Sequence, residues 1–185
     1  MTSHTLRSAL LALLAITLIS GCDGNARAQG DNAASGIERT GSVTGRIGAA
    51  SIDTHTLKMV FDGAVRATAN FGSPVGFMTE FTIQGHTGTS FAIKDSVSVT
   101  FSISNGQLVA GGVLYLPEEG MFPHYVDHND SVQVTLDVFE DNGDTAIVKG
   151  TAAGTIYRLT GYTAEPDAAD ALEVDLTFEA TAYRE

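Results

Sequence analysis

The residues with the clearest potential for chemistry lie in one short polar run, His124-Tyr125-Val126-Asp127-His128-Asn129-Asp130. Two imidazoles four residues apart and two carboxylates could hold Zn²⁺, and the oxygens alone could hold Ca²⁺. The candidate metal ligands are His124, Asp127, His128 and Asp130. The competing interpretation is a solvated loop in which the Asp and Asn side chains cap backbone amides. We favour that interpretation and expect no resident cofactor.

The same run ends the longest predicted connection of the chain, Pro117 to Asp130. Long loops on a rigid sheet scaffold frequently carry function. This one combines Met121, Phe122 and Tyr125 with acids and histidines, and apolar anchors within a polar rim are typical of binding patches. Phe122 and Tyr125 are therefore the candidate binding residues. The alternative is that their rings only pin the loop to the sheet.

Familiar catalytic motifs are missing from the sequence. There is no G-x-S-x-G elbow, no H-E-x-x-H helix motif and no phosphate-binding loop. The enzymatic alternative is a hydrolase that takes its acid and base from the 124–130 run. We expect instead a protein without catalytic residues.

The second chemically distinctive residue is Cys22, the only cysteine of the chain. Ahead of it, Ser8 to Ile19 is an uncharged stretch rich in Leu and Ala, preceded by a short segment that carries Arg7. Such a stretch has the length of a signal-peptide core and is too short to anchor a protein across a bilayer. The run Leu18-Ile19-Ser20-Gly21-Cys22 resembles the lipobox of bacterial lipoproteins.

The lipobox resemblance implies where the protein is located in the cell rather than what it does. It implies that Cys22 becomes an acylated N-terminus after cleavage, with the lipid bilayer as a partner and the domain in the periplasm or outside the cell. Several acyl chains make a durable anchor, whereas one holds a protein only marginally. The alternative is cleavage by ordinary signal peptidase after Ala26-Arg27-Ala28, which would release a soluble protein starting at Gln29.

Composition narrows the class of the mature protein. The formal net charge is -12, which argues against nucleic acid as a partner. Hydrophobic residues make up 43% and charged residues 17% of the chain, as in globular domains. We expect three parts: a signal peptide at 1–21, the lipidated cysteine with a Gly- and Asn-rich flexible tether at 22–40, and a single β-domain at 41–185.

Apolar residues in the domain recur with a period of two, which predicts half-buried strands of an antiparallel sheet. The last strand is the cleanest example, because charged and hydroxyl residues such as Glu173 and Glu179 alternate with apolar ones. Its predicted core face consists of Leu172, Val174, Leu176, Phe178, Ala180 and Ala182.

Turn residues predict how strands connect. Asn105-Gly106 suits a two-residue type I′ turn, which would set Ile103 opposite Leu108 and Phe101 opposite Ala110. Such a turn makes a tight hairpin with apolar residues facing apolar residues.

Two further hairpins are predicted. A three-residue loop at Asp141-Asn142-Gly143 with a left-handed Gly would set Leu136 opposite Val148. Asp62-Gly63 marks the other, in which Arg66 faces either Lys58 or Met59.

These signals together predict an antiparallel β-sandwich of about ten strands joined largely by hairpins, with a closed up-and-down β-barrel as the alternative. The expected function is that of a membrane-anchored envelope lipoprotein whose non-catalytic domain binds an envelope protein or a small ligand. The alternative function is a carrier of an apolar ligand inside a barrel, which would need an empty lumen.

Overall fold

The computed structural model describes residues 36–185, which form ten β-strands and no helix. This confirms the predicted all-β fold. The strands are β1 (Ile37–Ile47), β2 (Ala50–Phe61), β3 (Ala64–Ala67), β4 (Ala69–Val75), β5 (Met78–Gly85), β6 (Ser96–Ser104), β7 (Gln107–Leu116), β8 (His124–Asp141), β9 (Thr145–Leu159) and β10 (Asp167–Arg184). Within residues 36–185 no helix is long and apolar enough to cross a membrane.

All ten strands belong to one hydrogen-bonded sheet in the order β3-β2-β1-β10-β4-β5-β6-β7-β8-β9. Most neighbours follow one another in the chain and are antiparallel, as short hairpin connections require. The exception is a short parallel contact between the end of β10 and β4. Because β9 also pairs with β10, the sheet curls back on itself and closes part of a ring.

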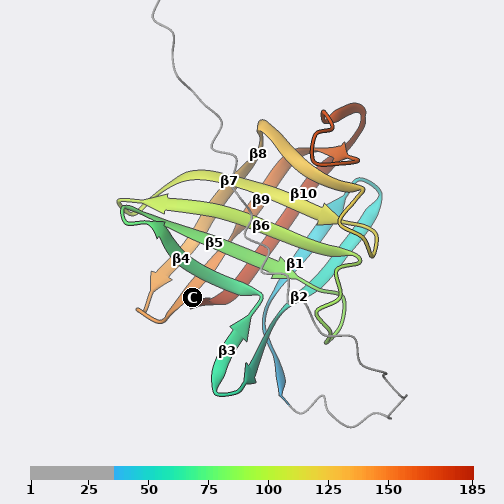
Figure 1. Cartoon of the computed structure of the whole chain (residues 1–185). Coiled ribbons are helices and arrows are strands. Elements are labelled where there is room, and N and C mark those ends of the chain that lie inside the picture. Colours follow the sequence, from blue (N-terminus) through green and yellow to red (C-terminus); the bar gives the residue numbers. More distant parts are fainter. Residues whose placement is uncertain (1–35) are drawn as a thin grey trace, which may run out of the picture. The chain divides into compact units, whose positions relative to one another are not determined.

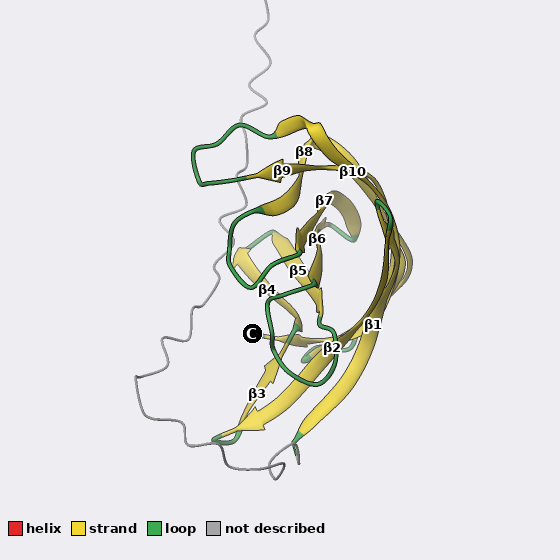
Figure 2. Ribbon diagram, turned by 90° about the vertical axis from the view of Figure 1, so that its right-hand side faces the viewer, coloured by secondary structure: helices red, strands yellow, loops and turns green. Residues whose placement is uncertain are grey.

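The curled sheet has two layers that enclose one core, the arrangement of a β-sandwich. In Figure 1, strands β4 to β7 lie in front and cross the strands of the layer behind them, which runs from β8 through β10 to β1. Figure 2 shows the same layers from the side, with β10 and β1 forming the curved outer wall. The predicted antiparallel fold with mostly hairpin connections is confirmed.

Four stacked phenylalanines fill the centre of the domain. Phe71 stacks on Phe81 with ring centroids 5.0 Å apart, Phe81 on Phe101 at 4.9 Å, and Phe101 on Phe178 at 5.9 Å. All four are buried. They come from β4, β5, β6 and β10, so the stack runs from one layer to the other and ties them together. The interior is therefore packed with side chains.

The C-terminal strand has the two faces that its sequence predicts. Val174, Leu176, Phe178, Ala180 and Ala182 are buried, and Leu172 is partly buried. The acidic residues between them are exposed. Buried and exposed side chains alternate strictly here. The reason is that β10 lies between β9 and β1 in the sheet and exposes one of its faces to solvent.

The Asn105-Gly106 turn is confirmed, with the positive φ angles of 51° and 74° that a type I′ turn requires. Ile103 pairs with Leu108 as predicted, but Phe101 faces Gly111 rather than Ala110. A β-bulge is the reason, because it inserts one extra residue into β7 and shifts every pair beyond it.

The hairpin between β8 and β9 has the predicted left-handed glycine, since Gly143 has a φ of 85°. Its register differs from the prediction, because Leu136 faces Gly150 and not Val148. The loop lies further along the chain than predicted, and a bulge between Leu136 and Val138 shifts the pairing again. The β2–β3 hairpin pairs Met59 with Arg66, one of the two predicted registers.

Two strands begin at other positions than the sequence suggested. Strand β1 begins at Ile37, four residues before the predicted start of the domain. The predicted loop 117–130 ends at residue 123, because β8 begins at His124. In both places a strand continues through polar residues because it has a partner, β2 for the first and β9 for the second.

Candidate functional site

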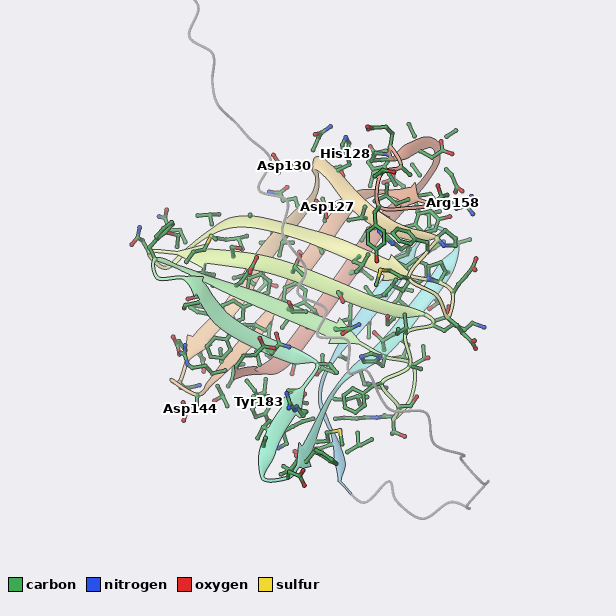
Figure 3. The ribbon with its side chains drawn as sticks, viewed as in Figure 1. Asp127, His128, Asp130, Asp144, Arg158 and Tyr183 are labelled. Atoms are coloured by element: carbon green, nitrogen blue, oxygen red, sulfur yellow. The ribbon has the colours of Figure 1, made fainter. Side chains whose placement is uncertain are left out.

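The polar run 124–130 is the first part of strand β8 rather than a free loop. Its first four residues pair with residues 156–159 of β9. A break in the register follows, where Asn129 and Asp130 adopt left-handed φ angles of 54° and 57°. Asn and Asp tolerate this conformation better than most residues, which explains why polar residues occupy this bulge. Figure 3 shows Asp127, His128 and Asp130 along this part of β8.

The structure does not gather the four candidate metal ligands into one site. Among residues 36–185, no three His, Cys, Asp or Glu side chains lie close enough together to hold a metal ion. His124 Nδ1 donates a hydrogen bond of 2.8 Å to the carbonyl of Met121. The ring of His128 packs edge-on against Tyr157 on β9. The sequence spacing suggested proximity, but in an extended strand residues four positions apart, such as His124 and His128, are separated by about 13 Å.

Asp127 is partly buried beside β7. Desolvation raises the pKa of its carboxyl above the usual value, and hydrogen bonds from its own backbone N–H and that of Val113 oppose the shift. The side chain also occupies the space next to Gly112, where an added Cβ would meet the carboxylate. Asp127 therefore belongs to the packing between β7 and β8.

Phe122, one of the two candidate binding residues, packs against the start of β8 and the β9–β10 connection. Its ring stacks on His124 with a centroid separation of 4.8 Å and meets Tyr162 edge-on, also at 4.8 Å. The Tyr162 hydroxyl donates to Met121 Sδ at 2.8 Å. These contacts join the β7–β8 connection to the start of β8 and to the β9–β10 connection.

Tyr125, the other candidate, lines an open cleft of about 350 Å³. The cleft lies where the β1–β2 turn, the end of β7 and the start of β8 meet. Its walls are mostly apolar and aromatic, and Glu118 and Arg158 add one charge of each sign. The apolar and aromatic walls include Ile47, Ala50, Tyr115, Pro123, Tyr125 and Leu172.

One side of the cleft is organised around the Asp170 carboxylate. The Tyr125 hydroxyl donates to Asp170 Oδ1 at 3.1 Å, and Arg158 Nη1 lies 3.4 Å from Asp170 Oδ2. Desolvation, together with the nearby Asp170 carboxylate, raises the pKa of Tyr125. The phenol therefore stays protonated and acts as a donor at neutral pH.

Tyr115 completes the aromatic wall. Its ring centroid lies 6.3 Å from that of Tyr125, and burial followed by the nearby Asp95 carboxylate raises the pKa of its hydroxyl. Arg158 lines the cleft while it pairs with Asp170, and its side chain is a little more than one third exposed. The cleft thus offers two rigid phenol rings and one cation.

A second hollow, of about 450 Å³, lies on the outer face over β8, β9 and β10. Lys149 and Glu179 line it and form an ion pair of 2.9 Å with each other. No aromatic side chain lines this hollow, so it is a weaker candidate than the cleft at Tyr125.

Sequence reasoning found Tyr125 but missed Tyr115, Arg158 and Asp170. A signal for Tyr115 was available, since an aromatic residue at the end of a strand next to a long connection is placed to line a site. Arg158 and Asp170 had no such signal, because Arg158 becomes relevant only through the pairing of β8 with β9 and Asp170 only through the pairing of β9 with β10.

Cys22 lies outside the described residues, as does most of the predicted tether. Compared with family models, curated proteins and solved structures, the chain matches none. Functional inference for this protein therefore depends on its residues and on the geometry of its site.

Proposed function

We propose that this protein is a lipid-anchored envelope lipoprotein whose β-domain is a non-catalytic binding module, with the cleft at Tyr125 as its binding site. The main support is the cleft, because it combines apolar walls, two phenol rings and a partly exposed guanidinium in one concave surface. Binding sites commonly have this make-up, with few polar groups that orient the ligand within a mostly apolar lining. The run that ends at Cys22 supports the anchor.

The chemistry of the cleft indicates the class of ligand. An apolar body would pack between Tyr115, Tyr125 and Leu172, and an acceptor group such as a carboxylate or carbonyl would meet Arg158. A small molecule of this kind fits the volume, and so does a protruding apolar side chain of an envelope protein together with its backbone carbonyl.

The other functions considered have less support. A carrier of an apolar ligand needs an empty lumen, and the stack from Phe71 to Phe178 occupies the interior. A hydrolase needs an acid and a base that converge, whereas His124 is engaged by Met121 and Asp127 packs against β7.

Recovery of a partner from membranes tests the binding site. We expect Tyr125→Ala to reduce partner recovery by the mature protein at least about tenfold, the effect of losing an aromatic anchor worth about 1.4 kcal/mol or more. Tyr157→Ala is the matched control, because Tyr157 lies on β9 with its ring against His128 and outside the cleft. Equal recovery by the two variants would overturn the binding site.

Phe122→Ala separates binding from pinning. Its ring contacts the start of β8 and the β9–β10 connection outside the cleft lining, so we expect a lower melting temperature with partner recovery unchanged. Loss of partner recovery at an unchanged melting temperature would instead place Phe122 in the binding surface.

Mass spectrometry of the membrane-associated protein tests the anchor. We expect an acylated N-terminal Cys22 and release of a Cys22→Ala variant from the membrane. A mature N-terminus at Gln29 would contradict the anchor, and so would a Cys22→Ala variant that stays membrane-bound.

A further inference from the structure

The β2–β3 hairpin carries exposed apolar side chains at its tip. Val60 is 59% exposed, Phe61 61% and Val65 49%. Exposed side chains of this size are normal when scattered, but here three fall within six residues around one turn. Figure 1 shows the hairpin extending beyond the two layers of the domain.

The apolar residues lie on both faces of the hairpin. Val60 pairs with Val65, so these two side chains share one face, and Phe61 points to the other. The outer edge of β3 is also free within the described sheet, since β3 is its terminal strand. A protein partner docked on one face would leave the apolar side chains of the other face exposed. A lipid interface would cover the apolar side chains on both faces of an inserted tip.

The chain enters the domain beside this hairpin. Ile37, the first residue of β1, pairs with Met59 of β2. Fourteen residues separate Cys22 from Ile37, and a chain segment of that length reaches at most about 50 Å. An anchor at Cys22 would therefore hold the hairpin close to the bilayer surface.

Orientation agrees with a membrane-facing tip. The charges near the tip are balanced, because Lys58 pairs with Glu38 of β1 at 2.6 Å and the hairpin carries Arg66 and Asp62. The cleft lies at the other end of β1, where Ile47 contributes to its lining. At about 3.3 Å per residue the two ends of β1 are roughly 33 Å apart, so a domain held by its hairpin presents the cleft away from the bilayer.

We propose that the tip of the β2–β3 hairpin, formed by Val60, Phe61 and Val65, inserts into the interfacial region of the bilayer that holds the lipid anchor. The inference rests on the proposed anchor at Cys22, which brings the hairpin to the membrane. The distance from Met59 to the turn is about 10 Å, which matches the depth of interfacial segments. The unpaired edge of β3 limits insertion to this region, where water still satisfies backbone groups.

The chain offers a direct test because it contains no Trp and a single Cys. Phe61→Trp places a fluorescent reporter at the tip, and Phe77→Trp, at a 71% exposed position in the β4–β5 turn, is the matched control. The mature chain beginning at Cys22 is coupled through its thiol to vesicles of phosphatidylethanolamine and phosphatidylglycerol that contain a maleimide lipid. We expect a blue-shifted emission that brominated lipids quench for Phe61→Trp, and neither effect for Phe77→Trp.

A second substitution checks that the effect depends on the apolar tip. Adding Val65→Asp to Phe61→Trp should abolish the blue shift and the quenching, while the melting temperature of the variant reports that the domain is folded. Equal emission from Phe61→Trp and Phe77→Trp on vesicles would overturn the proposal. A blue shift that appears only when membrane proteins are added would also overturn it and would indicate a protein partner.

Thiol coupling makes this test independent of acylation in the cell. An absent blue shift counts against insertion of the hairpin and leaves the anchor intact. A Cys22 that carries no acyl group counts against the proposed function and leaves the vesicle result unchanged.

Discussion

Replacement of Phe178 by alanine tests whether the two layers depend on the aromatic stack. Phe178 is 1% exposed, and its ring stacks on Phe101 with a centroid separation of 5.9 Å. The Phe178→Ala change removes the ring from the centre of the core and leaves a cavity that a filled interior cannot easily close. We expect the free energy of unfolding to fall by about 3 to 5 kcal/mol, as for other Phe to Ala changes in protein cores.

The neighbouring residue supplies the control. Glu179 is exposed on the opposite face of β10, and its ion pair with Lys149 is open to solvent on both sides. Exposed ion pairs contribute about 0 to 1 kcal/mol, so Glu179→Ala should change the free energy of unfolding by less than about 1 kcal/mol.

Urea denaturation followed by circular dichroism measures both variants. The dependence of the unfolding free energy on urea should be unchanged, because a shift in midpoint at constant slope reports stability alone. Equal losses for Phe178→Ala and Glu179→Ala would refute the two-faced description of β10, and so would a loss below about 1 kcal/mol for Phe178→Ala.

Two further predictions concern close packing and a buried acid. At Gly150 an added Cβ would meet Thr135 O and lie 2.8 Å from Phe178 Cζ, so Gly150→Ala should lower the free energy of unfolding by about 1 to 3 kcal/mol. Gly72→Ala, with open space around the position, should change it by less than about 0.5 kcal/mol in the same urea titration. Because burial raises the pKa of Asp127, its ionisation costs the folded state more than the unfolded state. Asp127→Asn should therefore melt at a higher temperature than the unsubstituted protein at pH 7. The difference should vanish below the unfolded pKa of about 3.9. A difference in melting temperature that persists at low pH would show that the substitution acts through packing.

Strand periodicity was the part of the fold most accessible from sequence. The alternation from Leu172 to Ala182 could be assigned to faces because a half-buried strand imposes its period locally. The left-handed turns at Asn105-Gly106 and Gly143 were likewise predictable, since few residues adopt positive φ at low cost.

Pairing beyond the turns was harder to predict. The bulge in β7 moved Gly111 opposite Phe101, and the β8–β9 hairpin turned at a later position than expected. A bulge depends on how neighbouring strands twist and pack, and that information comes from residues distant in the chain. The same dependence explains why strands β1 and β8 begin earlier than their polar first residues suggested.

The sequence by itself determined the all-β class, the faces of the clearest strands and the lipobox-like run at Cys22, because each follows from residues close together in the chain. Only the tertiary structure decided that Tyr125, Arg158 and Asp170 meet at one cleft, and that Ile37 enters the sheet beside the exposed hairpin. These arrangements depend on which strands pair and where the curled sheet closes. Both are set by burial of the whole core rather than by any local pattern.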